Sequence, residues 1–297
     1  MRADTRSDTR RGRDVALAVP AAVSGALLAG HRLVPPPVSA LLDSFLPWLG
    51  LPVLVLVPLA VFLRSRAGTL AALLPVVAWS VLFVPDLAAS PDGGSAEFRV
   101  VTANLGGRAL AGSVADAELV AVQELTDANR ASVAAALDPG HPYKATVGTV
   151  GLWSRYPVSE VRRLDLGQGW PRALRARVRA PGGDVSVYAV HLASIRFGDS
   201  ATRDRTLRTL AALVEADPSD RLLVAGDLNT ASTDRLLAPL TTTLHDAREG
   251  FGFTWPAVFP LTRPDHILTR GFRTVDASVL EGGDSDHRAA LAALAPG

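Results

Sequence analysis

Apolar and polar positions divide the chain into two regions with different patterns. Three long apolar stretches without internal charge occupy the first third, at residues 15–30, 46–63 and 70–84. From about Phe98 onward, the apolar runs are short, rich in β-branched residues and separated by turn residues. The pattern predicts an apolar N-terminal part followed by a domain in which strands outnumber helices.

The N-terminal stretches have the composition of membrane spans. Each is slightly shorter than the roughly 20 residues that a bilayer core requires, and modest extension at the ends closes the gap. We predict three transmembrane helices within residues 14–85, where Pro20, Pro52 and Pro58 are compatible with membrane spans. The alternative for residues 15–30 is a cleaved signal peptide, for which Arg10 and Arg11 resemble a twin-Arg signal. No clear small-x-small cleavage site follows, and two more apolar stretches would still anchor the product.

Basic residues in the flanks predict the orientation. Residues 1–13 are rich in arginine, and the loop between the second and third apolar stretches carries Arg64 and Arg66. Both segments are expected to be cytoplasmic, because short cytoplasmic loops are enriched in Lys and Arg. Three spans then place the rest of the chain outside the cell membrane, with residues 86–97, rich in Pro, Gly and Ser, as a linker. The expected partner of residues 14–85 is the lipid bilayer.

Residues 98–297 are predicted to form one α/β domain. Apolar runs predict strands at residues 98–104, 119–125, 151–158, 174–180, 185–193 and 221–225. The sequence Pro181-Gly-Gly-Asp184 between two of these runs is typical of a hairpin turn. Helical spacing of Ala, Leu and Arg predicts helices at residues 128–137 and 199–216.

Composition excludes some classes of chemistry. The chain has 297 residues and no cysteine, so disulfides and thiolate metal sites are impossible. Its formal net charge is +1, but residues 97–297 contain 22 Lys and Arg against 23 Asp and Glu. A near-neutral domain argues against a strongly basic nucleic-acid binder, because non-specific binding to a polyanion depends on Lys and Arg contacts. Nucleic acid is therefore the less expected substrate.

Carboxylate and amide side chains follow several predicted strands. Asp227 and Asn229 stand two residues apart after an apolar run, so on extended backbone both point to the same side. Glu124 ends the run LVAVQEL, where a charge is costly unless it is paired or bound to a metal, and Asn104 ends the first strand. Such oxygen ligands suit Mg²⁺ or Mn²⁺. The alternatives are an ordinary turn at Asp227 and a solvated strand end at Glu124.

Histidines supply the remaining candidate chemistry. His191 terminates a predicted strand, where a lone histidine is more often structural than catalytic, and His287 follows Asp286 near the C-terminus. An imidazole that acts on a phosphoryl group benefits from a carboxylate on its other nitrogen. Asp265 can serve His287 in this way, whereas the adjacent His266 is expected to point to the opposite side of the strand.

These segments, in this order, resemble the endonuclease/exonuclease/phosphatase superfamily, which has the DNase I-like fold. The resemblance covers residues 98–294 and rests on the segments TANLG, VQEL, LWSRYPV, YAVHL, AGDLN, RPDHIL and DSDH. It implies a four-layered α/β sandwich, in which two mixed β-sheets pack face to face with helices outside. Three spans followed by such a domain also resemble the membrane proteins of teicoplanin resistance called VanJ.

The resemblance implies a metal-dependent phosphoester hydrolase site at one edge of the sandwich. Asn104, Glu124 and Asp286 would hold Mg²⁺ or Mn²⁺. Asp227 would orient or deprotonate the attacking water, and Asn229 and His191 would stabilise the pentacovalent phosphorus. His287, backed by Asp265, would complete the acid/base pair or hold a phosphate oxygen. The acidic residue that orients the histidine in many relatives has no identifiable counterpart for His191.

Three functions are compatible with this reading. The first is a membrane-anchored phosphoesterase that acts on a lipid-linked phosphate or pyrophosphate, or on a phospholipid, of the cell envelope. The second is an extracellular endonuclease or exonuclease. The third is a catalytically inactive binding or sensor domain, which the intact set of carboxylates and histidines disfavours.

Overall fold

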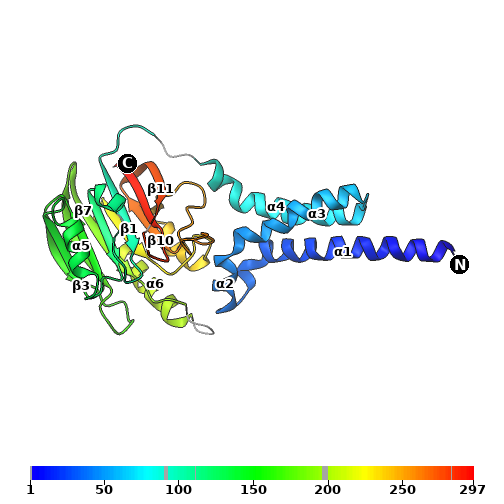
Figure 1. Ribbon diagram of the computed structural model, residues 1–297, viewed down its shortest axis with the longest axis horizontal. Helices are drawn as coiled ribbons and strands as arrows, with labels where there is room; N and C mark the ends of the chain where they lie inside the picture. Colours follow the sequence, from blue (N-terminus) through cyan, green and yellow to red (C-terminus); the bar gives the residue numbers. More distant parts are fainter. Residues whose placement is uncertain (1, 90–92, 111, 196–199, 282) are drawn as a thin grey trace. The chain divides into compact units, whose positions relative to one another are not determined.

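The computed structural model describes residues 2–89, 93–110, 112–195, 200–281 and 283–297. The chain divides into two compact units, residues 1–88 and residues 89–297 (Figure 1). The first unit is entirely helical and contains the three apolar stretches. The second contains all the strands and all the motif residues.

Helices of very different length make up the N-terminal unit. Two of them, the stretch 8–33 and the helix Arg66–Ala88, are long and apolar enough to cross a membrane. A third span exists only if two helical segments that meet at 68°, Val38–Ser44 and Leu46–Phe62, are counted as one. The elements are α1 (Arg2–Gly30), η1 (His31–Leu33), α2 (Val38–Ser44), η2 (Leu46–Gly50), α3 (Leu51–Phe62) and α4 (Arg66–Ala88).

The predicted middle span, residues 46–63, is not one continuous helix. It consists of the 3₁₀ turn η2 followed by α3, whose 12 residues extend only about 18 Å. Prolines explain the break: Pro47 and Pro52 each stand in the first turn of their helix, the position where the missing N–H costs no hydrogen bond. The structure therefore leaves the prediction of three transmembrane helices unconfirmed.

Helices α1 and α4 run parallel to each other within this unit (Figure 1). Gly68 lies against Leu17 near the start of α4, and Gly25 lies against Leu74 further along both helices. The turn before α4 is held at the same level, since Ser65 Oγ donates to Asp14 Oδ1 at 2.5 Å. Two parallel helices in one chain require the segment between them to run back, and α2, η2 and α3 provide this return.

The C-terminal unit is built on two six-stranded mixed sheets. The strand orders are β11-β12-β1-β2-β4-β3 and β5-β6-β7-β8-β10-β9. Each sheet contains one parallel pair, β1 with β2 and β7 with β8, and the other neighbours are antiparallel. The strands are β1 (Phe98–Asn104), β2 (Leu119–Gln123), β3 (Tyr143–Val147), β4 (Val150–Ser154), β5 (Val158–Arg163), β6 (Ala173–Ala180), β7 (Gly183–His191), β8 (Leu222–Asp227), β9 (His245–Asp246), β10 (Asp265–Arg270), β11 (Phe272–Leu280) and β12 (Ala289–Pro296).

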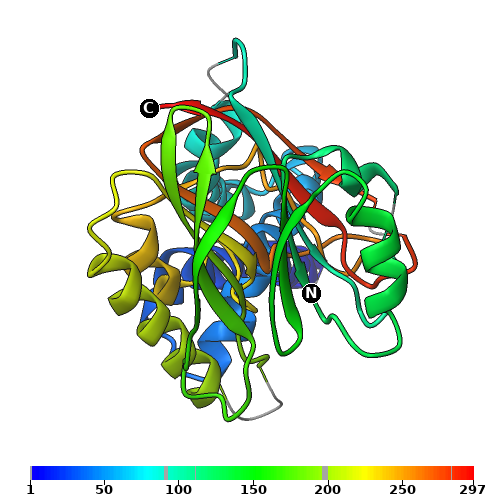
Figure 2. The same cartoon turned by 90° about the vertical axis from the view of Figure 1, so that its left-hand side faces the viewer.

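The domain has four layers in the order helix, sheet, sheet and helix, with a large apolar core between each pair of neighbouring layers. The central core lies between the sheets and includes Phe98, Val187 and Ile267. Helix α5 (Arg130–Leu137) covers the outer face of the first sheet, and α6 (Ala201–Glu215) with the short α7 (Ala238–Thr241) covers the second. Figure 2 shows α5 and α6 on opposite sides of the paired sheets. The arrangement confirms the α/β sandwich of the DNase I-like type.

One predicted strand is wrong. Residues 151–158 divide between β4, in the first sheet, and β5, in the second. The chain changes sheets through a turn at Arg155, Tyr156 and Pro157, which Ser154 closes by accepting from Tyr156 N at 2.9 Å and donating to Tyr156 O at 2.8 Å. The segment carries its own turn signal, because Pro157 lacks the N–H that the interior of a strand needs.

Candidate active site

Strand ends bring the motif residues to one edge of the sandwich. Asn104 is the last residue of β1, and Glu124 follows the last residue of the parallel strand β2. In the other sheet, His191 and Asp227 are the last residues of the parallel strands β7 and β8 and lie opposite each other in register. Parallel strands end at the same edge of a sheet, so residues far apart in the sequence meet there.

Asn104 links the two sheets. Its Nδ2 donates to Asp227 Oδ2 at 2.8 Å and lies 3.5 Å from Glu124 Oε1, while its Oδ1 accepts from Gly106 N at 3.0 Å. The side chain is buried, with 3% of its surface exposed. A neutral amide between two carboxylates screens their repulsion, so Asn104 holds Glu124 and Asp227 close together.

Two of the motif residues have strained backbone. Glu124 and Asn229 lie in the left-handed region at φ of 58° and 48°. This conformation is uncommon for residues other than glycine and clusters at functional sites. Local hydrogen bonds hold it: Asn129 Nδ2 donates to Glu124 O at 3.1 Å, and Asn229 Nδ2 donates to Leu192 O at 3.0 Å. Both side chains are thereby turned to the edge where Asp227 lies.

His287 and Asp265 form a buried pair. His287 Nδ1 lies 2.8 Å from Asp265 Oδ2, and Thr254 Oγ1 donates to the same oxygen at 2.6 Å. The other ring nitrogen, Nε2, lies 4.0 Å from Asp227 Oδ2. Nδ1 is therefore committed to Asp265, and Nε2 is left to face the centre of the site. This is the arrangement that an orienting carboxylate gives to a catalytic imidazole.

His191 has a different environment. Its Nε2 lies 3.6 Å from Asp227 Oδ2, and Arg172 Nη2 lies 2.7 Å from its Nδ1 and 2.8 Å from its Nε2. Among the described residues, Asp227 is the one carboxylate within ion-pair distance of the ring. The separate orienting acid of many relatives is thus not found in the described part of the chain, and Arg172 contacts the ring instead.

The two histidines are driven to opposite protonation states. Burial lowers the pKa of His191 to about 4, with Arg172 and His287 adding to the effect and Asp227 opposing it. Burial also lowers the pKa of His287, but Asp265, Asp227 and Asp286 outweigh it and raise this pKa to about 10. At neutral pH His191 is neutral and His287 is protonated. Environments that separate two pKa values in this way distinguish an acid from its partners in a catalytic site.

Two groups of side chains offer donors to a divalent cation. Glu124, Asn104 and Asp227 lie together at the strand ends, and Asp286 lies beside Gly106 and accepts from Trp255 Nε1 at 3.3 Å. Carboxylate oxygens of this kind are ligands preferred by Mg²⁺, whereas Asn104 turns Nδ2 toward the carboxylates and accepts from Gly106 N at Oδ1. Asp227, Asp265 and His287 also place one donor atom each within 4.8 Å of one another. His287 Nδ1 in the latter group is already bonded to Asp265 at 2.8 Å, an arrangement suited to proton transfer.

His266 points away from the site, as expected from its place on the strand. It is fully buried, and its Nε2 bonds Thr230 O at 2.8 Å. The guanidinium of Arg263 contacts its other nitrogen at 3.2 Å and pairs with Asp246 at 2.6 Å. His266 therefore stabilises the backbone at Thr230, the residue after Asn229, from the side of the strand that faces away from the site.

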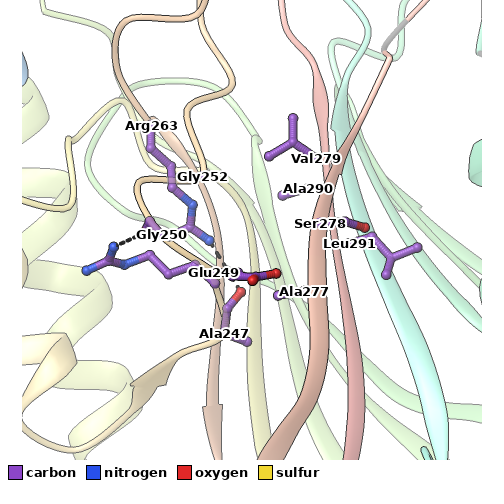
Figure 3. A pocket seen from close by; sticks show the side chains of 11 residues that line it. Ala247, Glu249, Gly250, Gly252, Arg263, Ala277, Ser278, Val279, Ala290 and Leu291 are labelled. Atoms are coloured by element: carbon purple, nitrogen blue, oxygen red, sulfur yellow. Dashed lines mark hydrogen bonds between the residues drawn. The ribbon is translucent and has the colours of Figure 1, made fainter. Parts of the chain in front are cut away.

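A cleft of about 270 Å³ lies outside the catalytic cluster. It is lined by residues 247–250, Gly252 and Arg263 on one side and by β11 and β12 on the other (Figure 3). None of the predicted site residues lines it, although Arg263, the first residue of the RPDHIL segment, does. The predicted site residues therefore lie outside this cleft, at the strand ends.

Gly226 explains why the AGDLN segment begins with glycine. A Cβ at this position would lie 1.9 Å from Val190 O on the neighbouring strand, so β7 and β8 could not pair closely where His191 and Asp227 meet. We expect Gly226→Ala to lower the free energy of unfolding by roughly 1–3 kcal/mol, as overpacking does. The measurement is thermal unfolding of the detergent-solubilised protein. Gly140→Ala is the matched control, since a Cβ there meets nothing within 4 Å; equal stability of the two variants would contradict the prediction.

The fold and the site together define a metal-dependent phosphoester hydrolase. The sequence model of the Endonuclease/Exonuclease/phosphatase family matches residues 101–287, more than half of the chain. The chain therefore belongs to this family. No curated protein sequence matches it.

Solved structures share the fold at low sequence identity. An endonuclease/exonuclease/phosphatase from Bacteroides vulgatus is 15% identical, with a TM-score of 0.57 over 67% of this chain and 99% of that one. Sphingomyelinase C from Streptomyces griseocarneus is 19% identical, with a TM-score of 0.54 over 66% and 98%. A β toxin variant from Staphylococcus aureus with bound magnesium ions is 14% identical, with a TM-score of 0.52 over 66% and 99%.

Two residues at the site were missed by sequence reasoning. Arg172 precedes β6, and Thr254 lies in the irregular segment before β10. Neither stands in a recognised segment. For Arg172, the available signal was its place directly before a strand whose hairpin partner ends in His191.

Proposed function

We propose that this hydrolase is a membrane-anchored, Mg²⁺- or Mn²⁺-dependent phosphoesterase whose catalytic unit lies outside the cell and acts on a lipid-linked phosphate, a lipid-linked pyrophosphate or a phospholipid. The observation that carries the proposal is the attachment of the catalytic unit to helices of membrane-spanning length. Because this attachment would keep the catalytic unit near the membrane surface, phosphates carried by membrane lipids are the proposed substrate class.

The parallel packing of α1 and α4 supports the extracytoplasmic side. If α1 crosses the bilayer from an arginine-rich cytoplasmic start, then the segment through α2, η2 and α3 returns the chain, because Ser65 bonds Asp14 near that start. Helix α4 then crosses in the same direction as α1. An odd number of crossings places residues 89–297 outside, even though the returning segment is bent.

The short tether supports a substrate at the membrane. Nine residues, 89–97, connect α4 to β1, and nine residues can span at most about 32 Å. A catalytic unit on such a tether meets phosphates at the bilayer surface far more often than phosphates in bulk solution. The fold shared with a sphingomyelinase C is compatible with a lipid substrate.

The roles of the residues are proposed from the family pattern together with their contacts. Asn104, Glu124 and Asp286 are assigned to the metal, which when bound polarises a phosphoryl oxygen and neutralises developing charge. Asp227 is placed to orient or deprotonate the attacking water. Asn229 and neutral His191 are assigned to stabilising the phosphoryl oxygens by hydrogen bonds. His287, protonated and oriented by Asp265, is assigned to donating a proton from Nε2 to the leaving oxygen.

The topology is tested by reporter fusions on either side of α4. A reporter that works only in the exported compartment should be active when fused after Pro91 and inactive when fused at Arg66, because the two positions follow opposite ends of α4. A cytoplasmic reporter should give the reverse pattern. Export activity at Arg66 without activity after Pro91 would place the catalytic unit in the cytoplasm and remove the case for an envelope substrate.

The substrate class is tested with the full-length protein in detergent micelles and Mg²⁺. Polyprenyl pyrophosphate, phospholipid and DNA are offered separately, and release of phosphate, headgroup or nucleotide is measured. We expect hydrolysis of a lipid substrate. Activity confined to DNA would support the nuclease alternative, and no hydrolysis of any phosphoester would favour a binding or sensor domain.

A further inference from the structure

The loop at residues 255–261 exposes apolar side chains beside the catalytic edge. At its apex, Val258 has 95% of its surface exposed and Phe259 has 65%. No charged residue occurs in the whole segment from Phe253 to Thr262. Single apolar residues are common on protein surfaces, but adjacent ones in an uncharged segment are typical of a site that contacts a partner or a membrane.

The loop is fixed to the catalytic edge by its backbone. Thr262 N donates to Trp255 O at 3.0 Å and closes the loop at its base. Ala257 N donates to Asp286 O at 2.7 Å, and Arg288 Nε donates to Ala257 O at 2.8 Å. The loop is therefore attached to the residues on either side of the catalytic imidazole, and its apex keeps a fixed position relative to the site.

The linker is held to the sandwich at the opposite end. Arg273 Nη1, on β11, donates to Gly93 O at 2.9 Å. Glu97 N donates to Leu294 O, on β12, at 2.6 Å. Only residues 89–92 lie between α4 and this attachment, and four residues span at most about 14 Å. The linker therefore keeps this end of the sandwich close to the membrane helix.

Both attachments lie on the same side of the sandwich. Strand β11 is the edge of the first sheet, and β10, which the loop precedes, lies beside the edge strand β9 of the second sheet. The cleft between residues 247–252 and β11 opens on this side as well (Figure 3).

The length of β1 separates the two attachments. The strand begins next to the linker and ends at Asn104 in the catalytic edge, about 20 Å away. A domain that stood upright on the linker would hold the catalytic edge about 20 Å or more from the bilayer, out of reach of a lipid phosphate. A second contact with the membrane, near the site, is needed to bring that edge down.

We propose that the side of the sandwich formed by β11, β9 and the 255–261 loop rests on the surface of the lipid bilayer, with Val258 and Phe259 inserted among the lipid headgroups. The bilayer is the occupant of this surface because the short linker keeps it within reach at a high effective concentration. The inference rests on the proposed membrane anchoring and deepens the proposed lipid substrate class, since it turns the catalytic edge toward the phosphates of the membrane.

The test uses the absence of cysteine, which allows labelling at a single introduced position. Full-length Val258→Cys carries an environment-sensitive fluorophore and is reconstituted in phosphatidylcholine vesicles, with and without nitroxide-labelled lipid. We expect blue-shifted emission and loss of most of that emission to the nitroxide. Ser159→Cys is the matched control, because Ser159 is exposed on β5, at the opposite edge of the second sheet, and should show neither effect.

A second measurement compares hydrolysis of phospholipid in vesicles with hydrolysis of soluble bis(4-nitrophenyl) phosphate, both with Mg²⁺. The double substitution Val258→Asp and Phe259→Asp should lower the ratio of the two rates about 10- to 100-fold, because charged side chains do not enter the bilayer and the apolar contact is lost. An unchanged ratio in a protein that hydrolyses both substrates would overturn the proposal.

The fluorescence result is read without turnover, so it separates this surface from the substrate class. Unshifted and unquenched emission at position 258 overturns the inference, even in a protein that hydrolyses lipid. A blue shift without quenching would show that a protein surface, such as a second copy of the chain, covers the apex, which also overturns it. Quenching in a protein that hydrolyses DNA alone supports the contact and contradicts only the lipid substrate.

Discussion

Loss of His287 or of Asp265 is expected to reduce kcat/KM by about 10²- to 10⁴-fold, the range of general acid–base catalysis. The double variant should be little worse than either single one, because the carboxylate acts through the imidazole that it orients at 2.8 Å. The experiment is a double-mutant cycle of His287→Ala and Asp265→Asn in the full-length protein. Circular dichroism and thermal unfolding verify that each variant is folded.

Two other histidines, His245 and His266, provide control variants for this experiment. His245 is exposed on β9, and no hydrogen bond or ion pair joins its side chain to a described motif residue, so His245→Gln should keep full activity. His266→Gln keeps Asp265 and His287 intact but removes support behind Thr230, and any loss there should be accompanied by lower stability. Multiplicative losses from His287→Ala and Asp265→Asn would show that the two residues act separately.

The protonation state of His287 provides a second measurement of the same unit. In the metal-free protein, NMR titration should find the His287 pKa raised to about 10. A raised pKa keeps the ring protonated through neutral pH, and the proton is lost only as the pH rises through that value. Asp265→Asn removes an anionic partner, so the His287 pKa should fall. A pKa that does not change would mean that Asp265 does not hold the proton on this ring.

Glu124→Gln is expected to have the second large effect. The amide keeps the volume of the side chain but removes the charge of an assigned metal ligand, so activity at limiting Mg²⁺ should fall by at least about 100-fold. Because affinity for the ion is lost, higher Mg²⁺ should recover part of the activity. The measurement is kcat/KM as a function of Mg²⁺ concentration.

Glu118 provides the matched control at the other end of the same strand. It precedes β2 and pairs with Arg99 and Arg155, far along the strand from Glu124. Glu118→Gln should leave the Mg²⁺ dependence unchanged. If Glu124→Gln behaves like Glu118→Gln, then Glu124 is a solvated strand end and the metal is held by other residues.

Local sequence patterns were sufficient for much of the fold. The strands at residues 98–104 and 174–180, the hairpin at Gly182 and Gly183, and the helix near residues 130–137 all form where apolar periodicity and turn residues predict them. Each of these elements buries one apolar face. The spacing of apolar residues that forms such a face can be recognised within a short stretch of sequence. The order of the polar segments after the strands likewise indicated the family before any geometry was available.

Strand β12 shows where local patterns fail. Its sequence, AALAALAP, consists of residues that favour helices, yet it pairs with β1 on one side and with β11 on the other. Two ladders of backbone hydrogen bonds and burial between layers outweigh a small intrinsic preference. The bent segment at residues 38–62 is similar, because Pro47 and Pro52 are compatible with a span but stand in the first turns of new helices in this packing.

The sequence by itself determined which residues could carry the chemistry, since Asn104, Glu124, His191, Asp227 and His287 all follow or flank apolar strands. Only the tertiary structure decided how they are used. Packing of the two sheets brings residues more than 100 positions apart within hydrogen-bond distance, as for Asn104 at the end of β1 and Asp227 at the end of β8. Burial and neighbouring charge then make one histidine neutral and the other protonated, and place Arg172 on the neutral one. Desolvation and electrostatics depend on distances in space, and the linear pattern does not contain those distances.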